Sequence, residues 1–451
     1  MSSPIRNVII LGEGYEPLLC AFYLAMRLKP LQPKIQVILT DEVKNRLVYT
    51  SPRMRSIHRD LGLDERKFLS ATGAGLVYAQ AYRKKNQPPS YFSTTQYGQF
   101  LEGVSVHHTL AKLAEEKSAI EWDDLNLSAQ IAKHSRLVWD VDSLPKPHFE
   151  IDFGYQIQER KLVEFLRHAC SQLDVRINQQ ALERIAIDNG AVSKVCLQNG
   201  EALTADFYLD CSEKGYIRKA QAIDFTTLPS NVFFNETIST QRTKEHSSPF
   251  GNIELGDQSI LTQYNHDGLE QTSHYTLNSQ HIPAYAQEAW VHNSLSLGKA
   301  YSNLPTLLFE PEAQLLRPLQ RLVELWPTTT SENATRQAFN KILSFEMTRI
   351  FEVTDIHFKS LLSQSLKCSD MATQRINLFE SSGRVISRDY DPLTTQQWPY
   401  LFLALGITPN SLDPLVDTLD LVKCHDVLSR MKKTINRVIQ HAPSYATRQV
   451  R

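Results

Sequence analysis

The start of the chain alternates apolar strands with an amphipathic helix. Residues 6–11 form an apolar strand that ends in a glycine-containing turn, and apolar side chains recur at helical spacing over residues 18–28. A second apolar strand covers residues 35–39. This order predicts a βαβ unit whose helix ends at Pro30.

Two helices are predicted further along the chain. The first covers residues 65–71, with Asp64 as its N-cap and Gly73 as its C-terminal stop. The second covers residues 159–173, where apolar residues at helical spacing create one buried face. This second helix has the clearest amphipathic pattern of the chain.

A meander of short strands is predicted after that helix. Residues 182–187, 191–197 and 201–203 are separated by Asn-Gly dipeptides, which favour tight hairpin turns. Another apolar strand follows at residues 207–211. We expect the meander to be inserted into one sheet that holds this strand and both strands of the βαβ unit.

The sequence after Pro305 becomes helical. Helices are predicted at residues 314–325, 333–362, 371–380, 396–405 and 413–439. They form a predicted C-terminal cap. Because no internal repeat or disordered linker occurs, the domains are expected to be interleaved.

Composition excludes several classes of protein. The 451 residues are too many for one ordinary domain, and two closely packed domains are expected. Lys and Arg total 48 against 49 Asp and Glu, so the chain lacks the positive charge of a nucleic-acid-binding protein. The six cysteines lack metal-ligand or redox spacing, and no apolar run reaches membrane-spanning length. We therefore expect a cytoplasmic protein without a metal site, a membrane partner or a nucleic-acid partner.

The turn after the first strand is the candidate nucleotide site. In a G-x-G-x-x-G turn the glycines let the backbone approach a pyrophosphate, and the helix N-terminus stabilises its charge. Gly12 and Gly14 fill the first two positions, but Pro17 fills the third. Glu13 and Glu16 would repel a pyrophosphate by on the order of 1 kcal/mol or more. The turn therefore favours a nucleotide-binding fold that no longer binds its nucleotide strongly.

Short motifs occur along nearly the whole chain. Residues 8–18 look like a G-G-G-T-A-G-W loop, residues 61–69 like an L-G-L-x-E segment, and residues 154–156 like the start of a G-Y-H-F-D segment. Further segments look like A-D-x-x-I-D-C-S-G, L-F-x-x-x-G-R and S-W-x-x-x-x-x-G, at residues 206–212, 379–385 and 398–406. Together these segments resemble the flavin-dependent tryptophan halogenase family, as a divergent member.

The resemblance implies an α/β fold with a FAD-type, Rossmann-like nucleotide-binding sheet, a β-meander, a substrate-side β region and a helical C-terminal cap. Residues 1–310 would form the FAD-binding-like domain, with the substrate-side region interleaved at about 75–150 and 225–300. Residues 311–451 would form the helical region. The implied cofactor is FAD, with vestigial contacts from Gly12, Gly14, Tyr15, Asp41 and Asp210.

The residues that carry the family's chemistry are changed in this chain. In the family, reduced FAD, oxygen and halide generate hypohalous acid, and a lysine after a G-A-F turn guides it to the substrate. Leu76 stands at the lysine position and has no nitrogen to carry a halogen. The W-x-W-x-I-P segment is missing near residues 259–264, the P-L-E-S-T-S loop is reduced to Glu310-Pro311, and Glu213 replaces a glycine. The flavin, halide and lysine sites are therefore expected to be degenerate.

Two functions remain open from the sequence. One is a FAD-dependent halogenase or monooxygenase that receives reduced flavin from a separate reductase. The other is a non-catalytic relative, a homodimer or a partner of an active paralogue, that binds a protein or a ligand. The aromatic residues, 9% of the chain, could line a pocket for an aromatic or peptide-like ligand.

Overall fold

The structure is a computed structural model. It describes residues 5–98, 101–139, 150–228, 234–256, 259–277, 283–305, 310, 312–327, 333–361 and 368–447. Within these ranges, none of the helices has the length and apolar character needed to cross a membrane.

The first sheet is built around the predicted βαβ unit. It has six strands, and β1 lies between β12 and β2 with both pairings parallel. In order along the sheet, the strands are β19 (Trp290–Val291), β20 (Ser294–Ser296), β12 (Phe207–Asp210), β1 (Asn7–Gly12), β2 (Lys34–Leu39) and β8 (Arg176–Gln179). Helix α1 (Glu16–Arg27) connects β1 to β2. The prediction that the first, second and post-meander strands share one sheet is confirmed.

The two faces of this sheet are covered by different elements. The meander forms a separate three-stranded sheet of β9 (Leu182–Asp188), β10 (Ala191–Leu197) and β11 (Ala202–Leu203). Its apolar side chains pack with Ile9, Leu11 and Tyr208 of the first sheet. Alternate residues of β1 face the other way and pack with α1 and α6 (Glu159–Ser171). The expectation that the meander joins the first sheet was therefore wrong, because it packs on that sheet's face.

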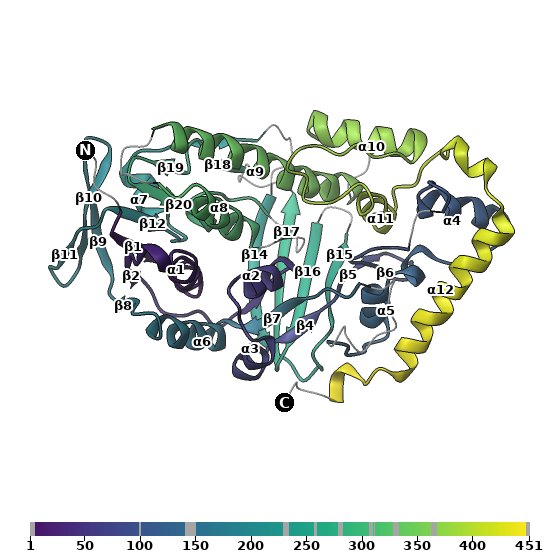
Figure 1. The fold of residues 1–451 in the computed structure, drawn as a ribbon, viewed down its shortest axis with the longest axis horizontal. Helices are drawn as coiled ribbons and strands as arrows, with labels where there is room; N and C mark the ends of the chain where they lie inside the picture. Colours follow the sequence, from purple (N-terminus) through teal and green to yellow (C-terminus); the bar gives the residue numbers. More distant parts are fainter. Residues whose placement is uncertain are drawn as a thin grey trace.

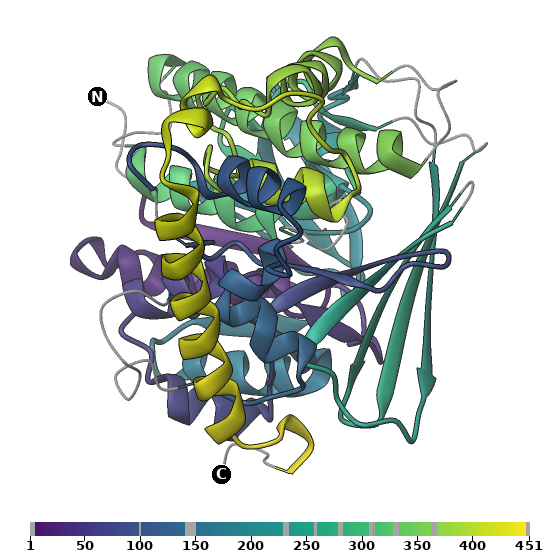
Figure 2. The same ribbon diagram turned by 90° about the vertical axis from the view of Figure 1, so that its right-hand side faces the viewer.

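A second sheet lies beside the first, as Figure 1 shows. It joins strands from two distant parts of the sequence, since β5 pairs in parallel with β15. Its strands, in order, are β14 (Phe234–Arg242), β17 (Leu269–Leu277), β16 (Ser259–His266), β15 (Phe250–Leu255), β5 (Ala79–Lys84) and β6 (Ser90–Phe92). Figure 2 shows these strands fanning out on one side of the molecule.

Shorter elements connect the two sheets. A three-stranded sheet holds β3 (Leu47–Tyr49), β7 (Gly154–Gln158) and β4 (Gly75–Val77), and a two-stranded one holds β13 (Phe225–Thr227) and β18 (Ala284–Ala286). The short helices are α2 (Arg53–Asp60), α3 (Glu65–Thr72), α4 (Val106–Glu115), α5 (Leu127–Lys133) and α7 (Tyr216–Ala220). The α3 prediction is confirmed, because Asp64 accepts bonds from the Arg66 and Lys67 N–H groups and Gly73 is left-handed.

The C-terminal part is helical, as predicted. Its helices are α8 (Ala313–Glu324), α9 (Asn333–Leu361), α10 (Asp370–Ser382), α11 (Trp398–Ala404) and α12 (Leu421–His441). In Figure 1, α9 and α10 run along one edge of both sheets, and α12 runs down the far side. The last helix begins later than predicted, because Pro414–Thr418 forms a separate 3-10 helix and Asp420 caps the new one.

Candidate functional site

The glycine turn connects β1 to the N-terminus of α1. Gly14 is left-handed, with φ of +66°, and Tyr15 is the N-cap without a side-chain capping bond. Pro17 lies in the first turn of the helix, where its missing N–H costs no hydrogen bond. The local backbone is therefore that of a strand-turn-helix unit.

A carboxylate of the chain lies directly against this turn. Glu159, the first residue of α6, places Oε1 2.2 Å from where a Cβ on Gly14 would be. Its side chain is fully buried and accepts two bonds from Arg46, at 2.7 Å from Nε and 3.0 Å from Nη2. The Glu159 N–H also donates to the Arg46 carbonyl at 2.9 Å. Because Gly14 has no side chain, the ion pair of Glu159 and Arg46 fits against the turn.

Two further carboxylates lie beside the turn. Glu13 accepts a bond from the Glu213 N–H at 3.0 Å, and burial raises the pKa of Glu13 above its usual value. Glu213 pairs with Lys44 at 2.5 Å and with Arg46 at 3.3 Å. Burial alone would raise the pKa of Glu213, but the bond from Lys44 and the nearby cations lower it. Arg46 therefore forms ion pairs with two carboxylates, those of Glu159 and Glu213.

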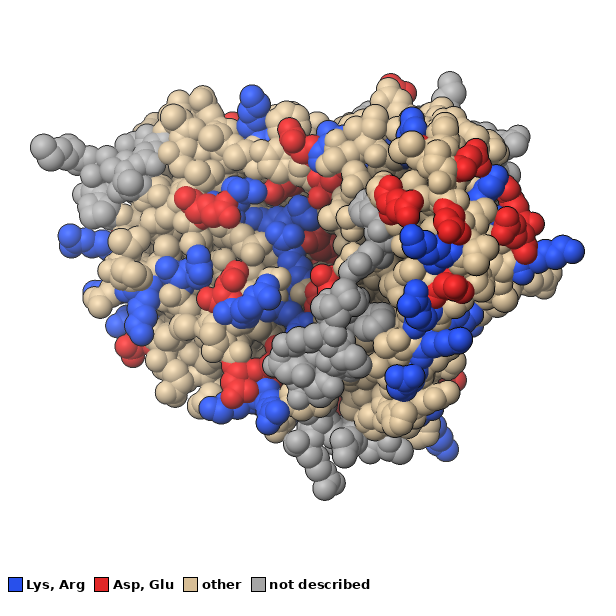
Figure 3. Space-filling model, turned by 45° about the vertical axis from the view of Figure 1, so that its right-hand side comes forward, with Lys and Arg blue, Asp and Glu red and all other residues tan. Residues whose placement is uncertain are grey.

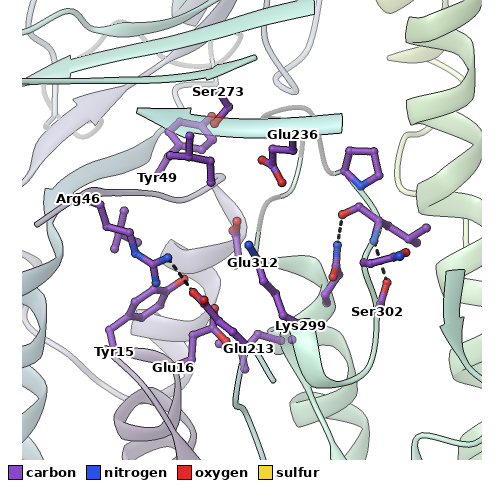
Figure 4. A pocket seen from close by; sticks show the side chains of 18 of the residues that line it. Tyr15, Glu16, Arg46, Tyr49, Glu213, Glu236, Ser273, Lys299, Ser302 and Glu312 are labelled. Carbon is purple, nitrogen blue, oxygen red and sulfur yellow. Dashed lines mark hydrogen bonds and ion pairs between the residues drawn. The ribbon is translucent and has the colours of Figure 1, made fainter. Parts of the chain in front are cut away.

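A cavity of about 480 Å³ opens next to the turn, between the two large sheets. Its walls come from the start of α1, β3, the segment after β12, strands β14, β16 and β17, and the start of α8. The surface is hollowed between its two halves, and Lys and Arg gather along one side of the hollow (Figure 3). Figure 4 shows Glu16, Glu236, Glu312 and Lys299 around the cavity. The cavity is thus lined by charges of both signs.

Two of these carboxylates have strongly shifted pKa values. Burial raises the pKa of Glu16 to about 7, against the charges of Arg46 and Lys299, which lower it. Burial likewise raises the pKa of Glu312 to about 7, although Ser51 donates hydrogen bonds to it. Near neutral pH, both groups can therefore exchange a proton or become ionised when a cation approaches.

The wall formed by β3 and the second sheet is aromatic. The rings of Tyr49 and Tyr264 stack with centroids 4.5 Å apart and an interplanar angle of 19°. The Tyr275 hydroxyl donates to Glu236 at 2.9 Å. Phe225, on the other wall, lies under the Arg218 guanidinium at 4.0 Å. Such a wall can bury an aromatic or aliphatic group of a ligand.

Three other residues selected from the sequence lie apart from this cavity. The exposed Asp41 follows β2 and accepts a bond from the Glu42 N–H at 2.9 Å. Asp210 is fully buried, and its oxygens accept bonds from Ser212 and from the Ile217 N–H. Leu76 is buried in β4, and its carbonyl accepts a bond from the Tyr445 hydroxyl at 2.9 Å. Tyr15 lines the cavity, whereas Asp41, Asp210 and Leu76 do not.

A comparison with protein families identifies the family of the chain. The model of the tryptophan halogenase family matches residues 7–251 and 261–421. This chain belongs to the tryptophan halogenase family. A search of curated proteins gave no match.

Solved halogenase structures share the fold of this family member. BrvH, a flavin-dependent halogenase from Brevundimonas sp. BAL3, superposes with a TM-score of 0.86 at 18% identity, over 98% of both chains. Xcc4156, a flavin-dependent halogenase from Xanthomonas campestris, gives 0.88 at 17% identity, over 98% of this chain and 97% of its own. SttH, a tryptophan 6-halogenase from Streptomyces toxytricini, gives 0.82 at 13% identity, over 99% of both. At these identities the likeness establishes the fold alone.

The residues at the glycine turn do not fit the pyrophosphate of the family's flavin. The space over Gly14 holds the Glu159 carboxylate, and the nearest cation, Arg46, is bound to it. Glu13 and Glu16 place two more carboxyl groups at the N-terminus of the same helix, and each adds negative charge there when it is ionised. An anion at this turn would meet carboxylates of the chain instead of free backbone N–H groups and an unpaired cation.

Sequence reasoning missed the residues that define this arrangement. Arg46 belongs to no motif, and its partner Glu159 is 113 positions away in the chain. Glu312 and its partner Ser51 are 261 positions apart. One signal was available for Glu159, because it begins the helix directly after the family-like segment at residues 154–156. The reduced halide loop lies partly outside the described residues, which include Glu310 but not residues 306–309 and 311.

Proposed function

We propose that this member of the tryptophan halogenase family binds a ligand in the cavity beside the glycine turn and does not catalyse flavin-dependent halogenation. The observation that carries the proposal is the position of the Glu159 carboxylate on Gly14. Glycine at this place serves close approach of a pyrophosphate in dinucleotide-binding turns. Here the space that glycine leaves is filled by the ion pair of Glu159 and Arg46, which stabilises the turn without a cofactor.

The charges around the turn support the same proposal. Glu13, Glu16 and Glu159 surround the N-terminus of α1, and their potential opposes that of the helix dipole. A bound diphosphate would need Arg46 to leave Glu159, and a buried carboxylate without its partner costs about 3–5 kcal/mol. We therefore infer that FAD binds weakly or not at all.

The position of Leu76 also supports a function without halogenation. By the motif resemblance this residue stands at the position of the family's lysine, and it packs in the core that contains β4 and α3. Neither a hydrogen bond nor a covalent halogen adduct can form at its hydrocarbon side chain. The proposal includes a cytoplasmic location, and a homodimer or an active paralogue as possible partner. If the chain proved active, a flavin reductase would be the expected partner.

Titration with FAD tests the proposal. Flavin fluorescence of a fixed FAD concentration should not change until the protein far exceeds the low-micromolar range, and the purified protein should be colourless. The variant Glu13→Gln/Glu16→Gln removes two charges and leaves Arg46 with Glu159. Its affinity for FAD should rise roughly tenfold or more, since each charge opposes the phosphates by about 1 kcal/mol. Low-micromolar or tighter binding by the unmodified protein would overturn the proposal.

A further inference from the structure

Two glutamates at the start of α8 differ in their partners. Glu310 pairs with Arg53 at 3.0 Å and with Arg317 at 2.6 Å. Glu312, which is 2% exposed, forms no ion pair with any residue that the structure describes. Its oxygens accept the Ser51 N–H at 2.9 and 3.1 Å and the Ser51 hydroxyl. One of two neighbouring buried carboxylates is thus neutralised by the protein, and the other is not.

The uncompensated carboxylate faces the cavity. Figure 4 shows Glu312 and Glu236 directed into the same space, below Tyr49. The ring of Tyr49 stacks with that of Tyr264, which also lines the cavity. A buried carboxylate without a counter-ion is costly, and a cation in the cavity would remove that cost.

The Tyr264 hydroxyl is a second, independent sign of a ligand. Tyr264 is 4% exposed and lines the cavity. In the described part of the chain, its hydroxyl has no hydrogen-bond partner. Buried hydroxyls in folded proteins are normally hydrogen-bonded. A ligand with several N–H donors would give a partner to this oxygen and a counter-charge to Glu312.

We propose that the cavity binds an organic ammonium ligand, with its charged nitrogen on Glu312 and Tyr264 and its hydrocarbon part against the tyrosine wall. An ammonium group carries three N–H donors and no acceptor, which matches the acceptors offered here. The stacked rings of Tyr49 and Tyr264 add a surface that attracts cations and covers a hydrocarbon chain. This inference rests on the proposed function, in which the cavity serves a ligand other than flavin.

The lysines of the cavity do not take this role. Lys299 is exposed, and its charge lowers the pKa of Glu16 and Glu213. Lys214 and Lys219 are also exposed, and none of the three lysines forms an ion pair with a described residue. Figure 4 shows the Lys299 side chain extending into the cavity toward Glu312, but the two groups form no ion pair. Glu312 therefore remains without a counter-ion among the described residues, and a ligand's positive charge can take that place.

Isothermal titration calorimetry of the full chain tests the proposal with two matched probes. 2-Phenylethylamine carries the ammonium group, and 2-phenylethanol has the same hydrocarbon part without charge. We expect the amine to bind at least roughly tenfold more tightly than the alcohol, as a charge-assisted bond to a buried carboxylate predicts. Phenylalanylglycine distinguishes the source of the group. Tighter binding than the amine indicates a peptide amino terminus, and weaker binding indicates a small amine.

Three variants locate the binding. Glu312→Gln should weaken amine binding by roughly tenfold or more and leave alcohol binding unchanged. Tyr264→Phe removes the unpartnered hydroxyl without a change in charge, and should weaken amine binding by about threefold or more. Glu254→Gln makes the same charge change at an exposed position of β15, and should have no effect.

Equal binding of amine and alcohol, an unchanged affinity of Glu312→Gln, or no heat with either probe would overturn the ammonium proposal. None of these outcomes would restore FAD binding or halogenation, so the proposed function would stand. Low-micromolar FAD binding would instead remove the proposed function, whatever the result with the amine.

Discussion

At the scale of single residues, the ion pair of Arg46 and Glu159 explains why a glycine is needed at position 14. Glu159 has no exposed side-chain surface, and Arg46 is 21% exposed. The distance of 2.2 Å to a Cβ at Gly14 leaves no room for a larger residue there. The G-x-G pattern at Gly12 and Gly14 could be read from the sequence, but the partner that occupies the turn could not.

Removal of the Glu159 charge should destabilise the protein. In Glu159→Gln the Arg46 guanidinium keeps its place but loses a buried counter-ion, and we expect a loss of about 3 kcal/mol in the free energy of unfolding. Urea denaturation followed by circular dichroism measures it. Glu164→Gln on the same helix is the control, because its pair with Arg160 is exposed and contributes less than about 0.5 kcal/mol. Equal losses in the two variants would contradict the assigned role of the ion pair.

The Glu312 carboxyl should make stability depend on pH. Its folded pKa of about 7 exceeds its ordinary value of 4.5, so between these values the folded state binds more protons than the unfolded state. Stability should therefore fall as pH rises through this window, by about 3 kcal/mol in total. Glu312→Gln removes this pH-dependent contribution to the free energy of unfolding. The stability of the variant relative to the unmodified protein should then rise by that amount between about pH 4.5 and pH 8.

Thermal and urea unfolding at several pH values measure the difference. Glu254→Gln should give a curve parallel to that of the unmodified protein, since this side chain is exposed. Parallel curves for Glu312→Gln as well would show that burial does not shift the titration of Glu312.

At the scale of elements, local patterns predicted helices and strands but not their neighbours. The Asn-Gly turns specify how the meander strands pair with one another. Their packing against Ile9 and Leu11 depends on which face of the first sheet is free, and no local pattern carries that information. The start of the last helix was also misplaced, because Asp413 and Asp420 each cap a different segment.

The cap at Asp420 should stabilise α12 measurably. Its side chain accepts the Lys423 N–H at 3.1 Å, and Asp420→Ala leaves this group to water. We expect a loss of about 1 kcal/mol in the free energy of unfolding. Asp426→Ala changes an exposed aspartate inside the same helix, and should be neutral or slightly stabilising because alanine favours the helix interior. Differential scanning calorimetry of both variants checks the prediction, which fails if the two behave alike.

At the scale of the whole molecule, the cavity exists because two sheets and the C-terminal helices meet. Tyr15 comes from the first sheet's helix, Tyr264 from the second sheet, and Glu312 from the start of α8. The sequence predicted the sheet, the meander and the helical cap, and its motifs indicated the family. It could not predict the cavity's charges, because Glu213 and Glu312 lie in turns outside the helices and strands, and their partners Lys44 and Ser51 are far along the chain.

The arrangement of the whole molecule also predicts that one substitution cannot create a halogenase. In Leu76→Lys, the new ammonium group would be buried in the core near α3, where Leu76 is 1% exposed and does not line the cavity. The variant should be less stable than Leu76→Met, which keeps the apolar volume.

Neither variant nor the unmodified protein should brominate tryptophan or indole when supplied with FAD, a flavin reductase, oxygen and bromide. Each missing transition-state contact costs roughly 2–4 kcal/mol, or a factor of about a hundred to a thousand in rate. Mass spectrometry detects the product as a bromine isotope pair, and formation that stops when FAD is left out would show that the chain is an enzyme.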